Sequence, residues 1–226
     1  MLVKITKLVH RLLRPIKHSI VRIVRQANIR AYAMGGRKPW SYGYSYSKFN
    51  FIRKVLNDDD LMAKFRNLAP LPHGYGTRYD ERVVEYPWAL SRLSASEGKL
   101  LDAGSIFNFR EIIEHPVVSI KDLTILTLAP EANAFWQRGI SYHYGDLRQL
   151  PFRDNWFDEV CCISTLGHIG MDNRMYTKEN TPREIGLEAA QAVKELIRVL
   201  RPKGWIISIY IRRRRLTWTM RQRHAP

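Results

Sequence analysis

The chain has 226 residues, enough for one α/β domain of ordinary size and an appendage. Its net charge of +16 lies at the two ends: residues 1–57 hold 13 Lys and Arg and no acid, and residues 212–226 hold six and no acid. The stretch between them has 18 basic and 21 acidic residues, a net charge of −3. A continuous basic track for nucleic acid is therefore not expected.

The only cysteines, Cys161 and Cys162, are adjacent in a predicted strand, so their side chains point to opposite faces. They offer neither a disulfide framework nor a metal site, which fits a reducing cytoplasm. No segment has about 18 or more uninterrupted apolar residues, and basic residues interrupt the N-terminus every few positions. We expect a cytoplasmic protein that is soluble or lies on the inner face of a membrane.

Residues 1–30 are predicted to form a basic amphipathic helix, kinked at Pro15. Apolar side chains recur on one face, and the polar face carries Lys and Arg but no acid. This pattern favours binding of residues 1–25 to an anionic membrane surface. The alternative is a helix that packs on the main domain or on a second subunit.

Residues 31–80 are predicted to be an aromatic-rich linker and a helical cap. The Gly, Tyr and Ser-rich part, 31–48, is not expected to be regular, whereas 50–68 has helical spacing. Trp40 and its neighbouring tyrosines can stack on a sugar or a base, but packing over a domain edge is the preferred interpretation.

Residues 81–211 alternate predicted strands and helices. Strands are expected at 99–103, 123–128, 140–144, 158–164 and 204–211, and helices at about 107–115 and 185–200. This alternation predicts a right-handed, doubly wound parallel α/β sheet. Ligands of such sheets bind at the carboxyl ends of the strands, beside the first strand.

The turn that follows the first predicted strand reads LLDAGSIFN, residues 100–108. A dinucleotide would need GxGxxG there, so that backbone amides can approach a pyrophosphate. Only Gly104 is present, and Ile106 and Asn108 stand where the other glycines should be. The turn therefore argues against an NAD-binding protein.

Five segments in order, LLDAGS, TLAPE, YGDLRQLPF, STLGHIGMDN and ELIRVLRPKG, resemble the class I S-adenosylmethionine-dependent methyltransferases, most closely the small bacterial enzymes of the methyltransferase type 11 kind. The resemblance covers about residues 81–209. It implies a Rossmann-like sheet, S-adenosyl-L-methionine as cofactor, and methyl transfer to a small polar acceptor such as the hydroxyl of a carbohydrate. The alternative is a degenerate, non-catalytic binding or scaffold protein on the same fold.

The resemblance also implies roles at the first turn. Asp102 orients the turn and the amino-acid end of the cofactor, Ala103 and Gly104 let the backbone approach it, and Asn108 donates to its carboxylate. Ile106 then has to point away from the ligand.

Further cofactor contacts are implied at the ends of the next strands. Glu131 matches the acid that holds the ribose hydroxyls, and Asp146 matches the acid that receives the adenine amino group, with Leu147 giving a backbone contact. Ser164 lies at the end of the fourth predicted strand. A helix or turn cap is the alternative role for either acid.

His168, just past the fourth predicted strand, is the candidate catalytic base, because an imidazole is the side chain best suited to proton transfer near neutrality. Related sequences commonly have an acid before this histidine, where this chain has Gly167. In the family that this chain resembles, an N-terminal segment closes over the cofactor. Tyr86 and Trp88 lie in the matching segment here and can face the sulfonium. Burial of these rings in the core is the alternative.

Residues 212–226 are predicted to be a basic tail. Such domains add an antiparallel hairpin, strands 6 and 7, after the fifth strand, but we find no alternating apolar pattern and no turn signal in RRRRLTWTMRQRHAP. We therefore expect both strands to be missing, through a frame disruption or a natural basic tail. Strand 5 would then be an exposed edge open to homodimerisation.

Overall fold

A computed structural model describes residues 19–169, 185–212 and 215–222. The chain divides into two compact units, Met1–Val84 and Glu85–Pro226. No helix within the described ranges is long and apolar enough to cross a membrane.

The first unit is helical. Residues 19–34 form a helix, followed by α2 (Tyr44–Leu56) and α3 (Asp59–Asn67). The prediction for 31–48 was wrong at both ends, because 31–34 end one helix and α2 starts at Tyr44. The first part of the helix predicted over residues 1–30, residues 1–18, lies outside the described residues.

The helix predicted over 50–68 is interrupted by a capped break. Asp58 has an extended backbone, and its Oδ1 accepts a hydrogen bond from Leu61 N at 3.0 Å, which starts α3. An aspartate in this position satisfies one of the free amides of a new helix, so two helices replace the single predicted one.

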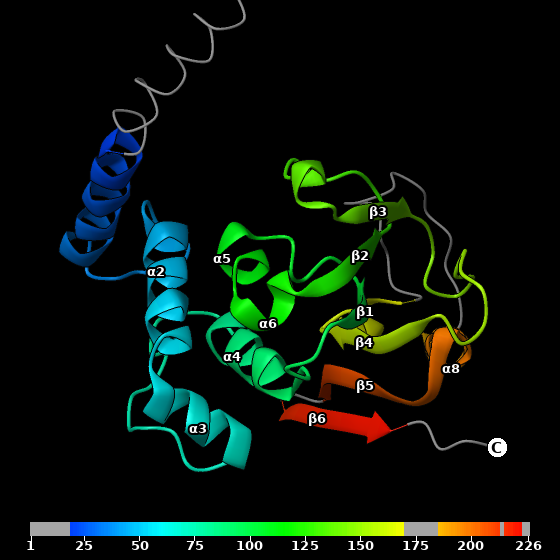
Figure 1. The fold of residues 1–226 in the computed structure, drawn as a ribbon. Coiled ribbons are helices and arrows are strands. Elements are labelled where there is room, and N and C mark those ends of the chain that lie inside the picture. The colour runs from blue at the N-terminus through cyan, green and yellow to red at the C-terminus, as the bar shows by residue number, and fades with distance from the viewer. Residues whose placement is uncertain (1–18, 170–184, 213–214, 223–226) are drawn as a thin grey trace, which may run out of the picture. The chain divides into compact units, whose positions relative to one another are not determined.

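The second unit contains a six-stranded sheet in the order β3-β2-β1-β4-β5-β6, and Figure 1 shows the strands in that order from top to bottom. The first five strands are parallel, as predicted. They are β1 (Gly98–Ala103), β2 (Lys121–Thr127), β3 (Ser141–Tyr144), β4 (Phe157–Ile163) and β5 (Leu200–Arg212). The direction of winding reverses between β1 and β4, which makes their carboxyl ends the switch point of the sheet.

The helices of this unit are α4 (Arg82–Arg92), α5 (Arg110–Ile113), α6 (Pro116–Ser119) and α8 (Ile185–Val199), with short 3₁₀ turns η1 (Trp136–Arg138) and η2 (Leu166–His168). The prediction of one helix over 107–115 was wrong. Pro116 forces His115 into an extended conformation with ψ 135°, and this separates two single turns.

The C-terminal segment forms a strand, contrary to the prediction of an irregular tail. β6 (Arg215–Gln222) pairs antiparallel with β5, from Trp205 opposite Gln222 to Arg212 opposite Arg215. The apolar residues Leu216, Trp218 and Met220 alternate with Thr217 and Thr219, a strand pattern that the surrounding arginines obscured. The expectation of an exposed β5 edge was therefore wrong, because β6 covers it. The described residues hold one strand after β5, where the family resemblance implied two.

The core between the sheet and α8 fixes the positions of the strand ends. β1, β4 and α8 contribute fully buried side chains to one cluster, including Leu101, Val160, Cys162, Ala192 and Leu196. Cys161 and Cys162 are buried free thiols whose pKa is raised by burial, that of Cys162 to about 12. Both are therefore inert packing residues.

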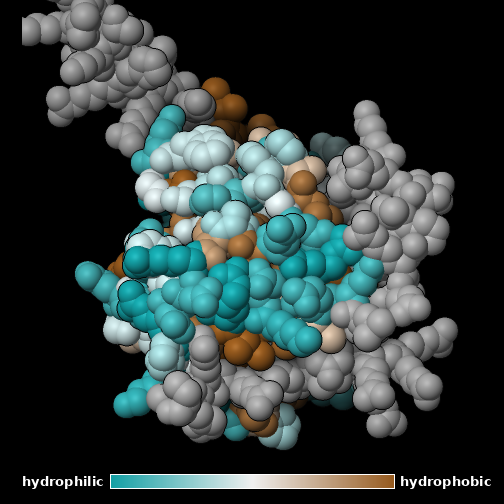
Figure 2. All heavy atoms as spheres, turned by 90° about the vertical axis from the view of Figure 1, so that its right-hand side faces the viewer, coloured by the Kyte–Doolittle hydropathy of each residue, from teal (hydrophilic) through white to brown (hydrophobic). Residues whose placement is uncertain are grey.

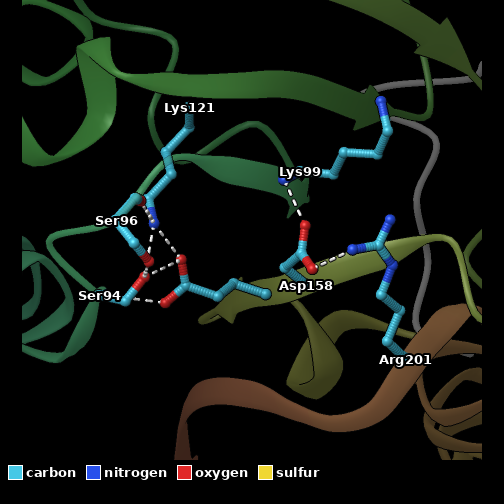
Figure 3. A network of polar contacts seen from close by, with 7 residues as sticks. Ser94, Ser96, Lys99, Lys121, Asp158 and Arg201 are labelled. Atoms are coloured by element: carbon cyan, nitrogen blue, oxygen red, sulfur yellow. Dashed lines mark hydrogen bonds and ion pairs between the residues drawn. The ribbon is translucent and has the colours of Figure 1, made fainter.

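A polar network lies near the amino ends of the strands, away from the switch point (Figure 3). Lys121 Nζ donates to Ser94 Oγ and Ser96 O, both at 2.7 Å, and lies 2.5 Å from Glu159 Oε2. Because the network is at the opposite end of the strands from the predicted site, we assign it a structural role. The face of the molecule in Figure 2 is mostly hydrophilic where described residues are drawn.

Candidate active site

Three residues with left-handed backbones lie at the switch point. Gly104 and Ser105 follow β1 with φ of 122° and 60°, and Ser164 follows β4 with φ of 52°. A side chain with φ > 0 costs free energy, and such residues cluster at functional sites. The backbone therefore marks the carboxyl ends of β1 and β4 as the candidate site.

Asp102 holds the first turn. It is fully buried, and its carboxylate accepts hydrogen bonds from Ile106 N at 3.1 Å and Phe107 N at 2.7 Å. Ile106 is 4% exposed and points into the core, and Ala103 is fully buried. Asp102 thus fixes the path of the backbone that follows β1.

Gly104 is required by its contact with the end of β4. A Cβ at this position would lie 2.0 Å from Thr165 Oγ1 and 2.8 Å from its Cγ2, and the backbone φ of 122° itself favours glycine. The space above Gly104 is therefore filled by Thr165. This contact joins the two strand ends that flank the switch point.

The two serines of the site have different environments. Ser105 is 7% exposed, and its Oγ is buried without a hydrogen-bond partner. Ser164 Oγ donates to the carboxylate of Glu85, a fully buried residue of α4. A buried hydroxyl without a partner is unusual in a native protein, and at the switch point a bound ligand can supply the missing partner.

Asn108 joins the first turn to the loop after β2. Its Nδ2 donates to Glu131 Oε2 at 2.8 Å and to Asn133 O at 2.9 Å, and its Oδ1 accepts from Tyr142 at 2.9 Å. Tyr142 Oη also accepts from Phe135 N at 2.9 Å. The structure thus brings together Asn108 and Glu131, which were predicted to hold the carboxylate and the ribose hydroxyls of the same cofactor.

Asp146 lies just after β3 and forms a forked ion pair with Arg148. Arg148 Nε is 2.9 Å from both carboxylate oxygens, Arg148 N donates to Oδ1 at 2.8 Å, and Nη2 also pairs with Oδ2. These bonds raise the pKa of Arg148, which also lies 2.9 Å from Glu188. Leu147 is buried in the core. A ligand amino group would share the Asp146 carboxylate with Arg148.

His168 is exposed at the end of η2, and its amide donates to Thr165 O at 3.0 Å. This bond places the imidazole one turn beyond Ser164 and Thr165. Tyr86 and Trp88, predicted to face the cofactor or the core, are 1% and 4% exposed. Tyr86 packs edge to face on Phe109, with 6.2 Å between ring centres, so its ring is part of the core.

Sequence reasoning missed Glu85, Ser105, Thr165 and Arg148. For Glu85 a signal existed, because it is the one acid inside the apolar run VVEYPWAL. The contacts of Thr165 and Arg148 depend on tertiary structure and loop geometry that no spacing reveals.

The residues at the strand ends offer hydrogen-bond partners to a polar organic ligand. Within the described ranges, no group of three or more His, Cys, Asp and Glu could hold a metal. An orphaned hydroxyl at Ser105 and carboxylates after β2 and β3 offer partners to a ligand with amino, carboxylate and hydroxyl groups.

Comparisons with known proteins point the same way. Residues 118–208 match the family model described as a methyltransferase domain. Among curated proteins, no sequence matches the chain.

Solved structures similar to this chain include the YcgJ protein from Bacillus subtilis, at 19% identity and a TM-score of 0.39, covering 57% of this chain and 50% of that one. A protein from Pyrococcus horikoshii has 19% identity and a TM-score of 0.42, with 61% and 60% covered. A SAM-dependent methyltransferase from Methanosarcina mazei has 16% identity and a TM-score of 0.36, with 50% and 52% covered. The chain thus spans 50–60% of the length of these structures.

Proposed function

We propose that this chain, whose residues 118–208 match a methyltransferase domain, is a class I S-adenosylmethionine-dependent methyltransferase. It binds S-adenosylmethionine at the carboxyl ends of β1–β4 and transfers the methyl group to a small polar acceptor. The observation that carries this proposal is the orphaned Ser105 hydroxyl beside Gly104, at the switch point of the sheet. A ligand bound there would give that hydroxyl its partner.

Different residues at the strand ends would bind different parts of the cofactor. The turn 102–108 would hold the amino-acid end, Glu131 the ribose hydroxyls, and Asp146 the adenine amino group, as the family resemblance implies. In this structure the Asn108 amide already donates to Glu131 and Asn133, and Arg148 already binds Asp146. Binding would therefore exchange some of these internal bonds for bonds to the ligand.

The bound cofactor supplies an activated methyl group on a sulfonium. Because that leaving group departs neutral, the protein mainly has to orient the acceptor and keep water out. The buried side chains of Ala103, Ile106 and Leu147 keep the strand ends apolar. The exposed imidazole of His168 would accept the proton that a hydroxyl or amine acceptor loses.

We propose a hydroxyl-bearing small molecule such as a carbohydrate as the acceptor. The competing function is a scaffold protein that keeps the fold without the chemistry. The match to a methyltransferase domain favours the enzyme.

The decisive experiment compares two serines by isothermal calorimetry with S-adenosylmethionine. Ser105→Ala and Ser208→Ala each remove a buried hydroxyl that has no partner, so neither should lower stability. Ser105→Ala should weaken cofactor binding about 5–20-fold, the value of one hydrogen bond. Ser208 lies within β5 and serves as the matched control, so its replacement should leave the affinity unchanged.

Asp146→Ala provides a second arm and should also weaken binding. Absence of any binding heat in the unmodified chain would support the scaffold function. Equal effects of the two serine replacements on the affinity would show that the switch point is not the cofactor-binding site.

A further inference from the structure

Exposed apolar side chains gather in the first unit. Of the fourteen large hydrophobic side chains that are exposed among the described residues, nine lie between residues 19 and 84. Five of these are on the helix of residues 19–34, which has no role in the proposed methyl transfer.

The helix has an anchored face. Tyr32 is 1% exposed, and its hydroxyl donates to Arg37 O at 2.9 Å and lies 3.1 Å from Arg78 O. Asn28 is also buried, and a Cβ on Gly43 would lie 2.1 Å from its carbonyl oxygen, so α2 starts directly against this helix. The orientation of the helix within its unit is therefore fixed.

A second face of the same helix is apolar and exposed. Ile20, Ile23, Val24, Ala27 and Met34, here called the exposed stripe, follow the spacing i, i+3, i+4, i+7 and i+14, which places them along one side of the helix. Ile23 is 66% exposed and Met34 is 88% exposed. Because Asn28 and Tyr32 fix the other face, the stripe is not available to the core of its own unit.

The charge around the stripe selects its partner. The helix carries Arg22, Arg25 and Arg30 and no acid, and the whole stretch 1–57 lacks Asp and Glu. Two copies that dock through this basic, acid-free segment would repel each other, which disfavours a helix dimer. Anionic lipid headgroups complement the charge, and acyl chains accept the aliphatic side chains.

We propose that the exposed stripe of residues 19–34 docks the protein on an anionic lipid bilayer, with the helix lying in the membrane interface. The apolar side chains insert between headgroups while Arg30, three residues from Ala27 and four from Met34, binds lipid phosphates. Trp40 and Tyr42, 74% and 75% exposed, follow this helix in the chain and are of the residue types that favour the interface.

The test uses the full chain with vesicles of equal parts phosphatidylcholine and phosphatidylglycerol in a flotation assay. Ile23→Glu should lower the partition coefficient about tenfold or more, since it replaces an inserted aliphatic side chain with a charge repelled by the lipid. Ile120→Glu is the matched control: Ile120 is an isoleucine 40% exposed in the second unit, and its replacement changes the net charge equally. It should alter partitioning by less than about twofold.

Two further measurements test whether attraction to anionic lipid causes the binding. Raising the salt concentration should weaken binding, and vesicles of phosphatidylcholine alone should bind much less. Unchanged flotation of Ile23→Glu would overturn the proposal. So would sedimentation showing that the unmodified chain is a dimer which Ile23→Glu dissociates, because the stripe would then bind a second copy. Circular dichroism of both variants checks that they fold alike.

Discussion

Lys121 Nζ lies 2.5 Å from Glu159 Oε2, and the two side chains are only 1% and 4% exposed. The pair joins the first residue of β2 to β4 across the intervening strand β1 (Figure 3). Both charges are otherwise satisfied, Lys121 by Ser94 and Ser96 and Glu159 by the backbone amide of Ser94 at 2.8 Å. A buried ion pair is tolerated in a protein interior only when both charged groups are present and both have hydrogen-bond partners.

Glu159→Gln should therefore lower the free energy of unfolding by about 3 kcal/mol, because it leaves the Lys121 ammonium buried without a counter-charge. Urea unfolding followed by circular dichroism measures the loss. Asp154→Asn is the matched control: Asp154 pairs with Arg198 at 2.7 Å, but its side chain is 67% exposed. That replacement should change the free energy by less than about 1 kcal/mol. Similar losses in both variants would show that burial of the Lys121 pair is unimportant.

Gly104→Ala should destabilise the second unit by about 2–4 kcal/mol, because the new Cβ would meet Thr165 and the backbone φ disfavours any side chain. Thermal unfolding measures this effect. Gly145→Ala is the control, since a Cβ there would meet nothing within 4 Å. If the clash with Thr165 causes the loss, Gly104→Ala/Thr165→Ala will recover part of it, because alanine removes both Oγ1 and Cγ2 of Thr165. No recovery would assign the whole effect to the backbone angle.

The stability of this unit should fall in acid partly through Glu195. Arg198 donates to both carboxylate oxygens of Glu195 at 2.7 Å, and these bonds lower the pKa of Glu195 below its usual value. A depressed carboxylate pKa stabilises the fold above the pKa of the unfolded state, and the stabilisation disappears as the pH falls through the folded value.

Glu195→Gln should consequently cost about 1.5 kcal/mol near neutral pH, and the cost should shrink as the pH falls through the lowered pKa of Glu195. Urea midpoints of both proteins across this range provide the measurement. A difference that stays constant with pH would mean that packing, and not charge, accounts for the effect of the replacement.

Much of the sheet could be predicted because its strands are buried and hydrophobic. β1 and β4 are largely buried, and the apolar residues Leu100 and Leu101 in β1 and the apolar run 160–163 in β4 show this without knowledge of their neighbours. β6 was missed because it is defined by pairing with β5, and antiparallel edge strands carry a weaker signal in the sequence.

The sequence predicts which residues lie near the strand ends, but not which side chains contact one another there. Asp102, Asn108, Glu131 and Ser164 lie at strand ends or next to them because the strand limits determine their positions. That Arg148 occupies the Asp146 carboxylate, and that Thr165 covers Gly104, depends on loop geometry. Family resemblance assigns a role to Asp146 but says nothing of the arginine two residues later.

The proposed base gives the last prediction. His168→Gln should lower kcat about 100-fold with a hydroxyl acceptor, because it removes the only imidazole among the described residues at the end of β4, while its polar amide keeps the size of the side chain. The affinity for S-adenosylmethionine should be unchanged, since no cofactor contact is assigned to His168. Transfer of a radiolabelled methyl group to a panel of hydroxyl-bearing small molecules measures kcat, and calorimetry measures the affinity.

His73→Gln, at an exposed histidine of the first unit, is the matched control and should keep full activity. Full turnover by His168→Gln would mean that the acceptor reacts without a protein base, and the family's methyl transfer would then rest on orientation alone.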